Sequence, residues 1–264
     1  MLKYVMFLTV VFAGLNFPFS SKSQVGKGET QAAISHKKLD IYLLIGQSNM
    51  AGRAEISGSD ADTLENVFLF TGNPEKQWEK AANPLNKYST IRKNPGMQKL
   101  GPGYHFAKQM LAADNQNAIG LVVNAKGGTS ILEWEPGGVF YNEAVKRTKE
   151  AMKYGTLKGI LWHQGESDAS RSDTYLPKIT NLIQAFRIDF NSPNLPVVVG
   201  QISEDKPQRT NFNKMILQVP AHIENTGVVT TENTSTIDST HFDSASQRLL
   251  GERYAREMLK LLNL

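Results

Sequence analysis

Short apolar segments alternate with longer amphipathic segments along most of the chain. Runs rich in branched apolar residues, typical of buried strands in a parallel sheet, occupy residues 37–45, 66–70, 118–123, 157–162, 195–202 and 227–230. Apolar residues at helical spacing occupy residues 102–114, 139–154, 174–190, 212–223 and 244–262. This alternation predicts an α/β fold, a three-layer αβα sandwich with a largely parallel sheet, over residues 37–264.

Four of the predicted strands are each followed along the chain by a cluster of polar residues. Because the carboxyl ends of parallel strands share one edge of a sheet, clusters that are distant in sequence converge there. The sequence therefore predicts one polar site at this edge, built from residues 46–49, 127–129, 163–166 and 238–241.

Ser48 follows the first of these strands in the sequence IYLLIGQSNMAG, residues 41–52. Gly46 permits a sharp turn that lifts the next residues out of the sheet, just before a helix. A serine exposed there is a candidate nucleophile if a base can reach it. The alternative interpretation is that Ser48 caps the helix, which is a common use of serine.

Asp238 and His241 provide the base that Ser48 requires. Three residues apart in a turn before the last helix, they can form a hydrogen bond that orients the imidazole and leaves its other nitrogen free to take a proton. The alternative is that Asp238 caps the helix and His241 is solvated. A serine at the same edge of the sheet favours the catalytic interpretation.

Acyl transfer also needs donors for the oxyanion that develops on the carbonyl oxygen. The candidates are the backbone N–H of Ser48, that of Gly127 or Gly128, and the side-chain amide of Gln164, and Gln47 is a further candidate for oxyanion or substrate binding. Glu166 either orients Gln164 or the imidazole, or is a structural carboxylate. His163 has no second ligand at metal spacing, so we predict neither a metal nor another cofactor.

The first 23 residues have the pattern of a secretory signal peptide, with a basic Lys3, a short apolar run and small polar residues up to Ser23. The alternative is a membrane anchor, but the run is short for a spanning helix. A polar linker follows over residues 24–36. We therefore predict a secreted or periplasmic protein of bacterial type, with no membrane association after cleavage.

Composition narrows the function classes further. The sequence has no cysteine, which excludes disulfides and thiol catalysis. Removal of the leader with Lys3 and Lys22 lowers the formal net charge from +4 to +2, which argues against a nucleic-acid partner. Residues 71–103 are rich in Asn, Pro, Gly and Lys, and we interpret this irregular insertion as one wall of a polar binding cleft.

Four motifs together resemble a known group of enzymes. GQSNMAG at 46–52, GGTS-I-x-x-W at 127–134, HQGESDA at 163–169 and DSTH at 238–241 resemble the SGNH-type esterases of carbohydrate esterase family 6 and the sialate O-acetylesterase domain. The resemblance covers nearly all of residues 39–260. It implies a flavodoxin-like sandwich, with Ser48 as nucleophile, His241 as base, Asp238 as its orienter and Glu166 as an additional acid partner.

The candidate catalytic residues predict a carboxylic ester hydrolase, and the resemblance implies that it removes O-acetyl groups from a polysaccharide or oligosaccharide, with acetyl xylan as the first candidate substrate. O-acetylated sialic acid is the alternative, and it would require an arginine for its carboxylate, with Arg53, Arg92 and Arg171 as candidates. A carbohydrate-binding protein without catalysis and a lipase-like hydrolase are further alternatives. The sequence predicts no oligomeric state.

Overall fold

The computed structural model describes residues 1, 2, 4, 38–204 and 206–264. The predicted leader over residues 1–23 and the predicted linker over 24–36 lie almost entirely outside the described residues. Among the helices formed by the described residues, none is long and apolar enough to cross a membrane.

One seven-stranded sheet forms the centre of the fold, with the strand order β3-β2-β4-β1-β5-β6-β7. Every neighbouring pair is parallel except β2 and β3, which are antiparallel. The prediction of a largely parallel sheet is confirmed. The strands are β1 (Leu39–Gly46), β2 (Val67–Asn73), β3 (Lys76–Lys80), β4 (Ala118–Ala125), β5 (Gly155–His163), β6 (Val197–Gly200) and β7 (Thr226–Val229).

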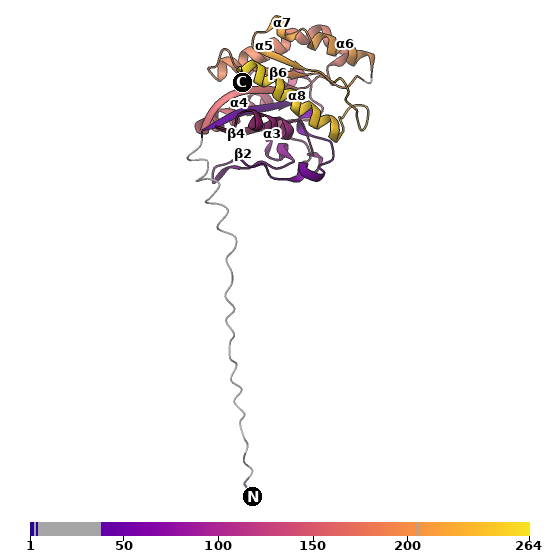
Figure 1. Ribbon diagram of the computed structural model, residues 1–264. Coiled ribbons are helices and arrows are strands. Elements are labelled where there is room, and N and C mark those ends of the chain that lie inside the picture. The colour runs from indigo at the N-terminus through magenta and orange to yellow at the C-terminus, as the bar shows by residue number, and fades with distance from the viewer. Residues whose placement is uncertain (3, 5–37, 205) are drawn as a thin grey trace.

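The central strand β1 is buried on both faces, which explains why residues 41–45 form an unbroken apolar run. Leu43 and Ile45 belong to one hydrophobic core, whereas Tyr42 and Leu44 belong to the core on the opposite face. The first core also contains residues of α4, α5 and α6, and the second contains residues of α3 and α8, so helices cover both faces of the sheet (Figure 1). The protein is therefore a three-layer αβα sandwich, as predicted. The helices are α2 (Ser48–Ala51), α3 (Gly103–Ala113), α4 (Val139–Ala151), α5 (Tyr175–Asp189), α6 (Pro207–Ile216), α7 (Val219–His222) and α8 (Ser244–Leu262).

Two local predictions were wrong. The insertion at 71–103 is not wholly irregular, because β3 forms a hairpin with β2 and places Trp78 opposite Phe70 in the core. The helix predicted over 212–223 is instead two helices, α6 and α7. Pro220 explains the break, since it has no N–H to donate to a carbonyl one turn earlier.

Candidate active site

The turn after β1 places Ser48 at the first position of the short helix α2. Gly46 has φ +133°, and a Cβ there would lie 2.1 Å from the carbonyl oxygen of His163 on the neighbouring strand. Only glycine fits this close approach. The N–H of Gln47 donates to the same carbonyl at 2.9 Å, which fixes the turn. Ser48 is therefore held at the carboxyl edge of the sheet.

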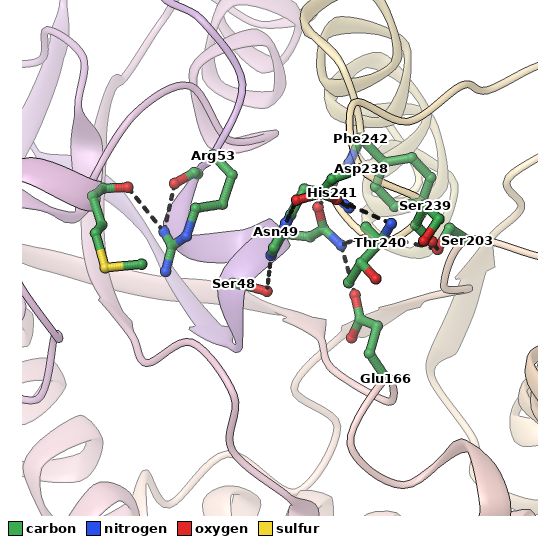
Figure 2. Close-up of polar contacts among 12 residues, drawn as sticks. Ser48, Asn49, Arg53, Glu166, Ser203, Asp238, Ser239, Thr240, His241 and Phe242 are labelled. Carbon is green, nitrogen blue, oxygen red and sulfur yellow. Dashed lines mark hydrogen bonds and ion pairs between the residues drawn. The ribbon is translucent and has the colours of Figure 1, made fainter. Parts of the chain in front are cut away.

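Hydrogen bonds link Ser48, His241 and Asp238 in a chain. His241 Nε2 lies 3.0 Å from Ser48 Oγ, and His241 Nδ1 lies 2.6 Å from Asp238 Oδ2 (Figure 2). Ser48 does not cap α2, because Gln47 occupies the cap position. An imidazole held by a carboxylate on one nitrogen can take a proton from a hydroxyl on the other.

Asp238 is fixed by its own loop as well as by the imidazole. Its Oδ1 accepts the backbone N–H groups of Thr240 at 3.1 Å and of His241 at 2.8 Å. Partial burial raises the pKa of Asp238, but the hydrogen bonds from the imidazole and from the two backbone N–H groups outweigh it, so this pKa is lowered overall. The carboxylate is thereby kept ionised beside the imidazole.

The glycine pair after β4, Gly127 and Gly128, lies beside Ser48. A Cβ on Gly127 would lie 3.3 Å from Ser48 Cβ and 2.6 Å from Arg53 Nη2, so a larger residue here would crowd Ser48 and displace the arginine side chain. Gly128 has φ +74°, in the left-handed region. The backbone at this strand end therefore forms one wall beside the serine hydroxyl.

These groups open into a cleft with a volume of about 360 Å³. Two residues of the 71–103 insertion, Lys93 and Met97, contribute to its wall, in agreement with the sequence interpretation. The complete lining comprises Gln47, Ser48, Arg53, Lys93, Met97, Gly127, Gly128, Glu166, Ser167, Arg209, Thr240 and His241.

Comparison with protein families identifies the family of this chain. The model of the family described as carbohydrate esterase, sialic acid-specific acetylesterase, matches residues 38–260. The chain belongs to this family. An Arabidopsis thaliana protein named probable carbohydrate esterase is 36% identical over 191 residues, which cover 65% of this chain and 71% of the plant protein.

The human sialate O-acetylesterase is 24% identical over 218 residues. The match covers 65% of this chain but only 41% of the human enzyme, so the chain spans about two fifths of that relative. Among solved structures, an Arabidopsis thaliana protein superposes with a TM-score of 0.76 at 29% identity, covering 84% of this chain and 98% of the other. A carbohydrate acetylesterase from Xanthomonas citri shares the fold, with a TM-score of 0.63 at 19% identity over 84% of this chain and 56% of the other.

Gln164 of this carbohydrate esterase does not line the cleft, although the sequence offered it as an oxyanion donor. Its side chain is fully buried, and Nε2 donates to Asp168 Oδ2 at 2.6 Å and to the Thr129 carbonyl at 2.9 Å. Tyr175 donates to its Oε1 at 2.7 Å. The Gln164 amide therefore bonds other protein groups and does not face the cleft. Its Nε2 also donates to Oε1 of Gln47 at 3.3 Å, and the side chain of Gln47 does line the cleft.

Glu166 lines the cleft but does not hydrogen-bond the imidazole, whose two nitrogens face Ser48 and Asp238. Its Oε1 accepts a hydrogen bond from Asn49 Nδ2 at 2.6 Å. Burial raises the pKa of Glu166, and the hydrogen bond from Asn49 opposes that rise only in part. The carboxylate is therefore coupled to the site through Asn49.

Two cations flank the glycine wall of the cleft. The guanidinium of Arg53 donates to the carbonyls of Gly52 at 2.6 Å and of Met97 at 3.1 Å, and within the described chain it bonds no carboxylate. Burial lowers the pKa of Arg53. Lys93 Nζ lies 3.1 Å from the position that a Cβ on Gly128 would take. This side of the cleft is therefore positively charged.

The other arginines proposed from sequence lie elsewhere. Arg92 bonds the carbonyl of Ser89, and Arg171 pairs with Asp168 Oδ1 at 3.1 Å, and neither lines the cleft. Sequence reasoning missed Arg209, which lies in the first turn of α6 and contacts Thr240 Oγ1 at 2.9 Å. No motif marks a lone arginine in a helix, so sequence patterns could not identify it.

His163 has a structural role. It is fully buried, its Nδ1 lies 2.9 Å from the hydroxyl of Tyr254, and burial lowers its pKa to about 4. The imidazole is therefore neutral and supports the strand end behind Ser48. Over residues 38–204 and 206–264, no three His, Asp or Glu side chains are arranged to hold a metal ion.

Proposed function

We propose that this carbohydrate esterase removes O-acetyl groups from sugars through a serine acyl-enzyme. The observation that supports this mechanism is the hydrogen-bonded chain from Ser48 through His241 to Asp238, with Ser48 and His241 in the cleft wall. A protein that only binds carbohydrate needs no such chain. The charged residues Arg53, Lys93 and Glu166 in the cleft lining favour a sugar over a lipid.

Ser48 Oγ attacks the acetyl carbonyl carbon while His241 Nε2 takes the hydroxyl proton. The negative charge that develops on the carbonyl oxygen is stabilised by the backbone N–H groups of Ser48 and of Gly127 or Gly128, with Gln47 at the cleft wall as a further donor. Each such donor contributes a factor of about 10²–10³ to the rate.

His241 then returns the proton to the sugar oxygen, which leaves as an alcohol, and acetyl-Ser48 remains. A water molecule attacks the acetyl-enzyme, with His241 taking its proton, and acetate departs as Ser48 regains its hydrogen. Asp238 keeps the imidazole oriented and stabilises its protonated form throughout both steps.

The substrate is either a neutral acetylated polysaccharide such as acetyl xylan, which the sequence favoured, or an acidic sugar such as an O-acetylated sialic acid. Arg53 and Lys93 at the cleft wall support the second, because a sugar carboxylate would complement their charge. The description of the matched family and the name of the human relative point the same way. We further propose that the leader directs the enzyme to the periplasm or the extracellular space.

The test measures acetate release from acetylated xylan, an O-acetylated sialoside and p-nitrophenyl acetate. Replacement of Ser48 by alanine is expected to lower kcat by about 10⁴-fold or more on every substrate that the wild type cleaves. If Ser48→Ala retains wild-type activity, the acyl-enzyme mechanism is wrong. Cleavage of xylan alone, or of the sialoside alone, assigns the substrate.

Arg53→Gln tests the charge of the cleft. If the substrate is the sialoside, this variant should lower its kcat/KM relative to that of p-nitrophenyl acetate by about tenfold, the value of one charge-assisted hydrogen bond. Arg256→Gln, at an exposed position on α8, is the matched control. An unchanged ratio in Arg53→Gln would remove the argument for an acidic sugar.

A further inference from the structure

Asn49, the residue after Ser48, uses every hydrogen-bonding position of its side chain. It is fully buried, and its Nδ2 donates to Glu166 Oε1 at 2.6 Å and to the Thr240 carbonyl at 3.0 Å. Its Oδ1 accepts from the N–H of Phe242 at 3.1 Å and from Gln247 Nε2 at 3.4 Å. A carboxamide offers two donors and two acceptors, so this inventory is complete.

The partners of Asn49 identify what it positions. Thr240 and Phe242 flank His241 on either side, and the Asn49 carboxamide bonds one backbone group of each (Figure 2). Ser48 and Asn49 are neighbours in α2, so two sets of hydrogen bonds join this helix to the loop of His241. Ser48 bonds the imidazole, and Asn49 bonds the backbone on both sides of it.

A purely local role for Asn49 does not fit these contacts. The residues that its side chain bonds lie 117 to 198 positions further along the chain, and none belongs to the turn between β1 and α2. A residue that only stabilised this turn would bond its near neighbours.

Glu166 completes the arrangement. Its Oε1 orients the Asn49 amide, and its Oε2 is a buried atom without a hydrogen-bond partner among the described residues. The charged groups that influence it are Arg209 of α6 and His241 of the loop before α8. Both ring nitrogens of His241 already face Asp238 and Ser48, so the hydrogen bonds that link Glu166 to the loop of His241 run through Asn49.

We propose that Asn49 is a positioning residue that sets His241 at proton-transfer distance from Ser48, and that Glu166 acts as the acceptor that orients Asn49. The proposal rests on the proposed function, since it concerns the same serine and histidine. A displacement of about 1 Å between reacting groups can cost about 10²-fold in rate, so a carboxamide that fixes this distance affects kcat.

Asn49→Asp is the most informative change because it keeps the shape and replaces only the donor. The introduced oxygen would face Glu166 Oε1 and the Thr240 carbonyl, both of which are acceptors. We expect kcat for p-nitrophenyl acetate to fall about 10²-fold, with KM changed little. Two carboxyl groups this close share a proton, which is lost as the pH rises, so the variant should also show a new decline of kcat on the alkaline side.

Adding Glu166→Gln to Asn49→Asp removes the shared proton, because the glutamine amide can donate to the introduced carboxylate. The alkaline decline should disappear in the double variant. In the wild-type background, Glu166→Gln can still present an oxygen to Asn49, so it should retain at least about ten times the kcat of Glu166→Ala. A direct charge effect of Glu166 on the imidazole would instead make these two variants equally impaired.

Asn213→Asp is the matched control. Asn213 is also a buried carboxamide that bonds a backbone N–H, a backbone carbonyl and a glutamate, at Ile202 and Glu204, outside the cleft lining. A comparable loss of thermal stability is expected there, with a much smaller loss of kcat. Equal losses of kcat in Asn49→Asp and Asn213→Asp, or equal values for Glu166→Gln and Glu166→Ala, would overturn the proposal.

Failure of the proposed function gives a different result. If the wild type cleaves no ester, the ¹⁵N chemical shift of His241 Nε2 still reports its hydrogen bond with Ser48 Oγ without catalysis. This shift should move toward the value of Ser48→Ala in Asn49→Asp and keep its wild-type value in Asn213→Asp. An unaltered shift in both would overturn the positioning role. If Asn49→Asp does not fold, Glu166→Gln and Glu166→Ala test the proposal instead. Glu166→Gln should lie closer to the wild type than Glu166→Ala in kcat or, without catalysis, in this shift.

Discussion

At the scale of single residues, the hydrogen bonds of Asp238 give each of its two carboxylate oxygens a separate role. One oxygen accepts two backbone N–H groups and the other faces His241 Nδ1. In Asp238→Asn the amide oxygen must accept the backbone N–H groups of Thr240 and His241, so the NH₂ group of the introduced side chain faces Nδ1. That nitrogen must then be an acceptor, which moves the ring proton to Nε2 and removes the base from Ser48. We expect kcat to fall about 10⁴-fold.

The measurement is acetate release from p-nitrophenyl acetate by Asp238→Asn, with Asp173→Asn at an exposed position as control. Hydroxylamine or another strong nucleophile should not restore the rate, because the defect lies in the proton transfer from Ser48. A loss of less than about tenfold would show that the carboxylate is not needed to orient the imidazole.

Sequence patterns reached Ser48, Asp238 and His241 because each follows a strand or precedes a helix in a recognisable turn. They did not reach the partners of Gln164 or Asn49. Both amides are buried, and their bonds connect segments up to 198 positions apart. A motif can mark a residue as unusual, but only the folded chain determines which donor meets which acceptor.

At the scale of elements, Asp60 ties together three segments that the sequence treats as unrelated. It lies in the 3₁₀ turn Gly58–Ala61 and is fully buried. Its carboxylate accepts from Arg248 of α8 at 2.6 Å and lies 2.8 Å from His105 Nε2 of α3. Loss of these charged hydrogen bonds in Asp60→Asn should lower the free energy of unfolding by about 2 kcal/mol, or the melting temperature by about 4–8 °C.

The pH dependence of this difference follows from the pKa of Asp60. Burial raises this pKa, but the hydrogen bonds from Arg248 and His105 outweigh burial and lower it. A carboxyl whose pKa is lowered on folding stabilises the protein above its unfolded pKa of about 3.9, and this contribution is lost as the pH falls.

Melting temperatures of the wild type and Asp60→Asn should therefore differ at pH 7 and converge below about pH 4. Glu65→Gln is the control, because its pair with Lys80 is largely exposed and should contribute less than about 0.5 kcal/mol. If the difference in melting temperature between the wild type and Asp60→Asn stayed the same below about pH 4, Asp60 would stabilise these elements by packing and not by its charge.

The elements that sequence analysis missed share a physical reason. Strand β3 has one buried apolar residue, Trp78, among polar neighbours, and a single apolar residue makes no repeating pattern that would predict a strand. Pairing with β2, and not its own pattern, makes it a strand. Long buried strands such as β1 need no such support, because an uninterrupted branched apolar run fits few other environments.

At the scale of the whole molecule, the strand order decides which clusters meet. Ser48 follows β1, Gly127 follows β4 and Glu166 comes after β5, and β4 and β5 flank β1 on its two sides. His241 instead lies on the loop after β7, at the far edge, and that loop brings it back to Ser48. The sequence predicted a common edge but not this order, since strand pairing depends on contacts between distant segments.

The whole-chain prediction concerns residues 1–23, whose pattern predicts an export signal cleaved after Ser23. Expressed from Met1 in a bacterium, the chain should appear outside the cytoplasm with Gln24 as its first residue, as determined by N-terminal sequencing. A chain that begins at Gln24 after an added initiator methionine should remain in the cytoplasm with the same specific activity, because every residue placed at the cleft lies between Gln47 and His241. Full-length protein in the membrane fraction would instead identify residues 1–23 as an anchor.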